Sequence, residues 1–252
     1  MIRLFRALAA LVVAVGFAGA ALAQNASEPF TPAQREALRQ MMREYILQNP
    51  EVLIEALESL EERRRVEGEQ RARQMLVERR EEIFNNPANP VLGNPNGNVT
   101  LVEFFDYRCP YCKQMHAPIA QLASEDRQIR FVHIQLPILG PESVVAARAA
   151  LASRVQNRYP QFHDALMAAR GNLDEAAIIR IAQSAGLDIA RLRADMNNPA
   201  IMAALDANRR LAEDLGVTGT PAFVVGDRLV PGAVDPATLR GMIQEARAAA
   251  PR

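Results

Sequence analysis

The sequence has few cysteines, no surplus of charge of either sign, and no long apolar run after its first residues. Its 252 residues include two cysteines, and 29 basic side chains balance 29 acidic ones. A neutral chain gives no support to nucleic-acid binding, which depends on positive charge. No stretch beyond the N-terminus approaches the roughly 20 apolar residues that a membrane-spanning helix needs. A chain of this length can form one or two domains with a real core, without the disulfides on which a small secreted scaffold depends.

The first 23 residues predict a cleaved export signal. Arg3 and Arg6 precede an apolar run that ends in Ala21-Leu22-Ala23, the small-x-small pattern of a signal peptidase site. The run is too short to span a bilayer comfortably, although an uncleaved membrane anchor is the alternative. No cysteine sits at the cleavage site itself, so a lipoprotein is not expected. Cleavage before Gln24 removes both arginines, which leaves a formal charge of −2. We therefore expect a periplasmic protein, in a compartment where disulfides persist.

Residues 24–96 predict a helical arm followed by a linker. Thr31 to Gln34 has the pattern of a helix-capping box with proline at the first helical position. The first helix is expected to end at Asn49-Pro50, where a second begins. Apolar side chains recur at helical spacing on both helices, at Leu38, Met41, Met42, Tyr45, Ile46, Leu53, Leu57 and Leu60.

The apolar faces of the arm need a partner, and the sequence leaves two alternatives open. They pack either on the chain's own following domain or on another copy of the chain. The segment that follows, up to Glu82, is densely charged and is predicted to be a solvated helix or linker, which favours the second alternative. A long coiled coil is not expected, because the heptad would continue at Glu67 and Gln74, beside Gly68. The Asn-, Pro- and Gly-rich stretch 85–98 is a predicted boundary.

From residue 97 onward the pattern is that of an α/β domain. A strand, a helix and a second strand in this order predict a parallel pair joined by a right-handed crossover. A long helical stretch follows, then two short strands around a Gly226-Asp227 turn, which predict a hairpin, and a last helix. The expected elements are strands at 99–107 and 129–137, helix 110–124, helices throughout 141–215, strands at 221–225 and 228–230, and helix 236–249.

Three interpretations of the cysteine pair in the stretch CPYC are open: a structural staple, half of a metal site, or a reactive pair. A disulfide that closes a four-residue ring stabilises by only about 2 kcal/mol, against nearly 5 for a ring of on the order of 100 residues. A structural zinc ion needs four ligands, and this motif supplies two. His116 lies one turn beyond Cys112, but His133 falls on a predicted strand and His163 on a distant helix. The sequence therefore predicts no structural metal site.

A reactive pair has a physical basis in this position. Cys109 directly precedes a predicted helix, whose unpaired N–H groups and positive dipole end stabilise a thiolate. Pro110 at the first helical position favours that helix start. We predict that Cys109 is an exposed nucleophile and that Cys112, one turn further, is the more buried thiol that resolves a mixed disulfide.

Two further features are candidates for the same site. Glu103 interrupts an apolar row of alternate residues on its strand, so burial should raise its pKa and suit it to exchange protons with Cys112. The alternative is an edge strand with Glu103 in water. Thr220-Pro221 enters the first hairpin strand, either as an ordinary strand start at an edge or as a cis peptide bond that brings Thr220 backbone groups to the cysteines and to an extended substrate.

Three motifs, VEFFDYRCPYC, LPILGPES and TGTPAFVVG, resemble in this order those of the DsbA-like thioredoxin-fold proteins, and the arm is similar to that of the ScsC (suppressor of copper sensitivity) branch. The resemblance implies an α/β thioredoxin fold over residues 97–252, with an inserted helical domain at about 141–215 and an N-terminal helical arm that oligomerises. It implies a catalytic set of Cys109, Cys112 and Glu103, and substrate contacts by Thr220, Pro221, Pro110 and Tyr111. No cofactor is implied besides the redox-active disulfide.

Two departures from the oxidase DsbA bear on the direction of the reaction. Tyr111 stands where the oxidase has histidine, and Thr220 stands before the proline where it has valine. Both differences favour a disulfide isomerase or reductase over a strong oxidase. The expected partners are exported proteins that contain cysteine, a membrane protein that resets the redox pair, and further copies of this chain. A monomeric oxidase, a copper(I)-binding role of Cys109 and Cys112, and a scaffold with incidental cysteines are the alternatives.

Overall fold

The structure is a computed structural model that describes residues 30–249, so the predicted export signal lies outside the described residues. The chain divides into two compact units, with the boundary after Arg63. Because their relative placement is not determined, each unit is described by itself. No helix within residues 30–249 combines the length and apolar character needed to cross a bilayer.

The first unit consists of helix α2 (Pro32–Gln48) and the beginning of α3 (Glu51–Glu78). The predicted capping box is present: the Thr31 hydroxyl accepts from the Gln34 N–H at 3.3 Å, and the Gln34 side chain accepts from the Thr31 N–H at 2.8 Å. Helix α2 buries no residue. The large apolar side chains of this unit are exposed in the single chain, namely Phe30, Leu38, Met41, Met42, Tyr45, Leu47, Leu53, Ile54, Leu57 and Leu60.

The second unit begins earlier than the sequence pattern indicates. The end of α3 and the short helix α4 (Arg80–Phe84) carry Leu76, Ile83 and Phe84, which are buried against strand residues such as Phe104. The prediction of a solvated helix or linker up to Glu82 is therefore wrong at Leu76. Three apolar side chains within a charged segment are enough to attach it to the core, because each one removes apolar surface from water.

The core of the second unit is a mixed five-stranded sheet in the order β1-β3-β2-β4-β5. The predicted crossover is present, since β2 and β3 are parallel, and β4 forms antiparallel pairs with both β2 and β5. Strand β1 pairs antiparallel with β3 and was not predicted, because it is only three residues long within the Asn- and Pro-rich stretch. The strands are β1 Val91–Gly93, β2 Val99–Phe105, β3 Ile129–Gln135, β4 Ala222–Val225 and β5 Arg228–Pro231.

Helices cover both faces of this sheet. Leu101 of β2 lies under α5 (Pro110–Glu125) and α11 (Pro236–Ala249), in a cluster that includes Met115 and Met242. The next residue, Val102, points to the opposite face, where it packs with α4 and α10 (Pro199–Asp214). This alternation follows from the two-residue period of a strand that is buried on both faces.

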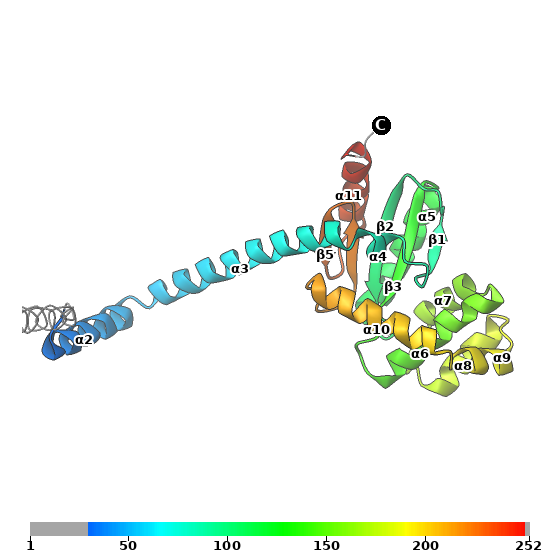
Figure 1. Ribbon diagram of the computed structural model, residues 1–252, viewed down its shortest axis with the longest axis horizontal. Coiled ribbons are helices and arrows are strands. Elements are labelled where there is room, and N and C mark those ends of the chain that lie inside the picture. The colour runs from blue at the N-terminus through cyan, green and yellow to red at the C-terminus, as the bar shows by residue number, and fades with distance from the viewer. Residues whose placement is uncertain (1–29, 250–252) are drawn as a thin grey trace, which may run out of the picture. The chain divides into compact units, whose positions relative to one another are not determined.

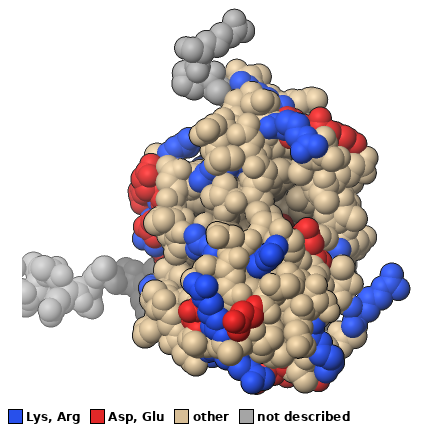
Figure 2. Space-filling view, turned by 90° about the vertical axis from the view of Figure 1, so that its right-hand side faces the viewer, with Lys and Arg blue, Asp and Glu red and all other residues tan. Residues whose placement is uncertain are grey.

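The predicted helical insertion between β3 and β4 is present and gathers at one end of the sheet, from which α10 returns (Figure 1). Its own apolar core continues into the cysteine turn, since Phe162 and Leu166 share a cluster with Cys109 and Cys112. The insertion contains α6 Pro141–Ala152, the 3-10 helix η1 Ser153–Gln156, α7 Tyr159–Ala168, α8 Glu175–Ser184, α9 Ile189–Asp195 and α10. On the face shown in Figure 2, acidic and basic side chains are interspersed among uncharged ones.

Candidate redox site

The cysteine turn joins β2 to α5 and presents both thiols inside the fold. Cys109 is the N-cap residue of α5 and Pro110 occupies the first helical turn, as predicted. Cys112 lies one turn into the helix and is fully buried, and both cysteines are free thiols. Cys109 is only 4% exposed, so the prediction of an exposed nucleophile is wrong for this conformation.

The loop of Thr220 accounts for the burial of Cys109. The peptide bond between Thr220 and Pro221 is cis, and the Cys109 thiol donates a hydrogen bond to the Thr220 carbonyl oxygen at 3.1 Å. The strand that follows, β4, lies between β2 and β5 and is not an edge strand. The structure therefore confirms the cis interpretation of Thr220-Pro221 and brings it to Cys109 across 111 positions of sequence.

Glu103 lies beneath the cysteine turn on β2, with β3 on one side and β4 on the other. The edge-strand alternative is therefore wrong. The side chain is buried, and its Oε1 atom has no hydrogen-bond partner among the described residues. Burial raises the pKa of Glu103 from 4.5 to about 8. The predicted direction of this shift is confirmed.

Glu103 and Cys112 affect one another electrostatically. Burial is the largest cause that raises the pKa of the Cys112 thiol, and the charge of Glu103 raises it further. A proton on Glu103 removes that repulsion and so makes the Cys112 thiolate easier to form. The pair can thus exchange a proton inside the protein, where bulk water has little access.

Asp106 organises the loops around the cysteines and was missed by the sequence analysis. Its buried carboxylate accepts hydrogen bonds from the backbone N–H of Ile138 and Leu139 at 2.9 and 3.0 Å, and from the Ser143 hydroxyl at 2.8 Å. It also accepts from the Arg108 N–H at 2.7 Å. These bonds give the motif LPILGPES a physical role, because they attach it to the turn that carries Cys109.

The rim of the site is apolar and accessible. The side chain of Tyr111 is 61% exposed, and Ile138 and Leu139 are 42% and 43% exposed. Arg108 holds this rim in place, since its guanidinium donates to the Leu139 carbonyl at 2.7 Å and to Glu142 at 2.9 Å. Clustered exposed apolar side chains are typical of interaction surfaces.

The three histidines lie together behind the turn, in contrast to the prediction that they are dispersed. His163 Nδ1 is 3.0 Å from the Tyr107 hydroxyl, and His133 Nδ1 is 3.1 Å from that of Tyr159. Burial lowers the pKa of His133 to about 3 and that of His163 well below its usual range. Helical periodicity identified the apolar face of α7 but not the strand that the face covers.

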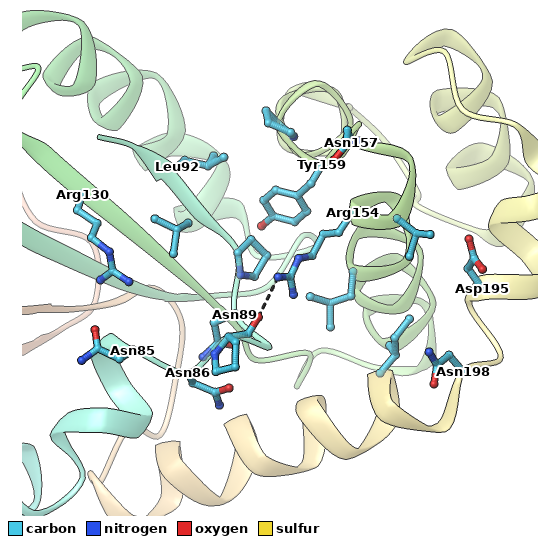
Figure 3. Close-up of a pocket in the computed structure, with 17 residues that line it drawn as sticks. Asn85, Asn86, Asn89, Leu92, Arg130, Arg154, Asn157, Tyr159, Asp195 and Asn198 are labelled. Atoms are coloured by element: carbon cyan, nitrogen blue, oxygen red, sulfur yellow. Dashed lines mark hydrogen bonds between the residues drawn. The ribbon is translucent and has the colours of Figure 1, made fainter. Parts of the chain in front are cut away.

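A cavity among the described residues is separate from the cysteines. It has a volume of about 890 Å³ and lies between β1, η1, α7 and the linker before β1 (Figure 3). Arg154 crosses it and donates to the carbonyls of Pro87 and Ala88. None of its lining residues belongs to the cysteine turn or to the cis-proline loop.

A family model described as a DSBA-like thioredoxin domain matches residues 100–244, which is more than half of the chain. The chain belongs to the DsbA-like thioredoxin family. A second model, described as the N-terminal domain of the copper resistance protein ScsC, matches residues 34–67. The two predicted resemblances are thus confirmed for this DsbA-like chain.

Solved structures agree with this assignment. A thioredoxin-like oxidoreductase from Silicibacter pomeroyi is 48% identical, with 68% of this chain and 99% of that chain covered and a TM-score of 0.67. The catalytic domain of Proteus mirabilis ScsC is 29% identical over 70% and 98% of the two chains, with a TM-score of 0.65. A periplasmic thioredoxin-like protein from Salmonella enterica serovar Typhimurium is 32% identical over 68% and 96%, with a TM-score of 0.61. These DsbA-like relatives support thiol-disulfide oxidoreductase activity.

The curated relatives are longer proteins. The Na(+)/H(+) antiporter NhaA 1 of Salinispora arenicola is 34% identical over 150 residues, which are 55% of this chain and 22% of the antiporter. The DsbA-like chain spans about a quarter of the length of such relatives.

Proposed function

We propose that this chain is a periplasmic thiol-disulfide oxidoreductase that acts mainly as an isomerase or reductase on misoxidised proteins. The hydrogen bond between the Cys109 thiol and the Thr220 carbonyl is the observation that carries the proposal. It places the reactive sulfur beside a backbone that can pair with an extended client. The Salmonella relative is described as periplasmic, and the predicted export signal agrees with that location.

The reaction starts from the dithiol form. The Cys109 thiolate attacks one sulfur of a client disulfide, forms a mixed disulfide and releases the other client sulfur as a thiolate. In isomerisation a client thiolate then attacks the client sulfur of the mixed disulfide, which frees Cys109 with no net redox change. In reduction Cys112 gives its proton to ionised Glu103 and attacks Cys109, which leaves a Cys109–Cys112 disulfide and a reduced client.

The mechanism assigns different roles to Glu103 and Tyr111. A carboxyl group with a pKa of about 8 exchanges protons readily near neutral pH. Tyr111 carries no imidazole to stabilise the thiolate, and a less stabilised thiolate makes the pair a weaker oxidant. A membrane redox protein that returns the disulfide to the dithiol is the expected partner.

The exposed apolar side chains of the arm support an oligomer. Such a series is unusual on a soluble monomer, and burying it between copies removes it from water. Several catalytic units around one client raise the effective concentration of thiolate, which suits isomerisation.

Refolding of a scrambled-disulfide protein tests the proposal. The mature chain is compared with a chain that starts at Arg64, because residues from Leu76 onward belong to the catalytic core. Leu57→Glu disrupts the arm without truncation, and the exposed Glu55→Gln is its matched control. We expect sedimentation to show monomers for the truncated and Leu57→Glu chains, with isomerase activity reduced severalfold. Equal isomerase activity of monomers and oligomers contradicts the oligomeric part of the proposal, and absence of exchange in all chains contradicts the whole.

Copper(I) binding by the two thiols is a second candidate, favoured by the match of the arm to a copper resistance family. Thiolates are soft ligands that suit copper(I). Titration of the reduced protein against a copper(I) competitor tests this role, and uptake that is unchanged in Cys109→Ser contradicts it.

A further inference from the structure

All three histidines of the sequence meet at one place in the second unit. His116 lies on α5, His133 on β3 and His163 on α7. The ring centroids of His116 and His163 are 5.4 Å apart, and those of His133 and His163 are 4.4 Å apart. The proposed redox chemistry uses none of these side chains.

Two of these histidines form a possible ligand set with an acidic neighbour. One atom each from His116, His163 and Asp164 lies within 4.8 Å of the other two. His116 Nε2 faces Asp164 Oδ1 at 3.4 Å. Donors around a tetrahedral zinc ion are about 3.3 Å apart, because each bond is about 2.0 to 2.1 Å long. The His116–Asp164 separation is already close to this value, and the side chain of Asp164 is 65% exposed, so the packed core does not hold it in place.

The surroundings of His163 can leave one ring nitrogen available to a ligand. When the Tyr107 oxygen accepts from Nδ1–H, at a separation of 3.0 Å, Nε2 keeps its lone pair for a ligand. A hydrogen bond on the other ring nitrogen is the usual support of a metal-binding histidine. His163 is also held between aromatic rings, since Phe105 lies edge-on at 5.3 Å and Tyr159 stacks at 5.6 Å. The His163 ring is therefore already held in place and loses little conformational freedom when it binds a metal ion.

Lys113 carries a positive charge close to His116, and this charge would repel a metal ion bound by the three side chains. It is the only lysine of the sequence and precedes His116 by three positions on α5. Its Nζ donates to the carbonyls of Leu166 and Ala169 at the end of α7, at 3.1 and 2.5 Å. Like charges repel, so this ammonium weakens the binding of a metal ion and its removal should strengthen it.

We propose that His116, His163 and Asp164 bind one divalent transition-metal ion of the zinc class, with water completing the coordination. Two imidazoles and a carboxylate suit Zn²⁺ and also Cu²⁺, whereas copper(I) prefers the thiolates of Cys109 and Cys112. The site is therefore distinct from the cysteine pair. A bound ion would join the catalytic helix α5 to α7 of the helical insertion.

Calorimetric titration of the oxidised mature protein with Zn²⁺ tests the site. The oxidised form is used because its Cys109–Cys112 disulfide removes both thiols as ligands. We expect one ion per chain, about 30-fold weaker binding in His116→Gln, and about 10-fold weaker binding in Asp164→Asn. Asp227→Asn, at an exposed position of the β4–β5 turn, is the matched control and should bind as the wild type does. Lys113→Gln should bind severalfold more tightly.

Two results overturn the proposal. One is the absence of saturable Zn²⁺ binding to the folded, oxidised wild type. The other is binding that neither Asp164→Asn nor His116→Gln weakens, which places the ion elsewhere. Asp164 is exposed and forms no hydrogen bond that the fold requires, so its variant tests ligation even where a histidine variant folds poorly. Competition by Cu²⁺ in the same oxidised protein distinguishes the two metals.

Discussion

Replacing Glu103 by glutamine should stabilise the protein at high pH, because it removes a buried ionisable group. In the folded state the pKa of Glu103 is raised from 4.5 to about 8 by burial. Between these values the folded chain keeps a proton that the unfolded chain has lost. The free energy of unfolding therefore falls by about 1.4 kcal/mol for each pH unit across this window.

The size of the effect follows from the width of the window. A shift from 4.5 to about 8 corresponds to roughly 5 kcal/mol between pH 4.5 and pH 8. Below the lower value both states are protonated, and the contribution is fully present; above the upper value both are ionised, and it is lost. Glutamine has no such titration, so the stability difference between Glu103→Gln and wild type should increase with pH and level off above about 8.

Urea unfolding of the oxidised protein from pH 4 to pH 9 measures this difference. The oxidised form is chosen so that Cys112 has no thiol to titrate. The buried histidines titrate equally in both proteins, so they cancel in the comparison. Glu175→Gln, at an exposed position of α8, is the control and should follow the wild type at every pH. Parallel stability curves for Glu103→Gln and wild type would refute the burial argument.

Three further predictions concern the same region. His133→Phe should reduce the loss of stability in acid, because burial lowers the pKa of His133 from 6.5 to about 3 on folding. The neutral imidazole stabilises the folded state fully above pH 6.5, and this stabilisation is lost at about 1.4 kcal/mol per pH unit as the pH falls towards 3. Melting temperatures of the variant and the wild type at pH 4 and pH 7 measure the difference. Asp106→Asn should cost about 2 to 4 kcal/mol, because three N–H donors and one O–H donor lose a charged acceptor. Asp227→Asn should cost nothing measurable in the same denaturation assay. Cys112→Ser should accumulate mixed disulfides with clients on non-reducing gels, since the resolving thiol is missing; free Cys112→Ser protein after incubation with a scrambled client would contradict the assigned roles.

Much of the catalytic unit could be predicted from local sequence pattern. Short runs of mostly apolar residues identified β2 and β3, helical periodicity identified the insertion, and the Gly226-Asp227 turn identified the hairpin. The position of Cys109 before a proline-led helix indicated the redox pair. Glu103 was a candidate because a carboxylate within an apolar row is costly to bury without a partner, so its pKa should rise.

The sequence by itself predicted a reactive role for the two thiols, and it determined the order of the elements and an arm with an uncovered apolar face. Only the tertiary structure decided what lies next to what. It brought the Thr220 carbonyl into hydrogen-bonding distance of the Cys109 thiol, and the Asp106 carboxylate to the backbone of Ile138. It also placed the His163 ring beside that of His116. The physical reason is that periodicity reveals which face of an element is apolar, whereas packing between distant elements selects the partner that covers it.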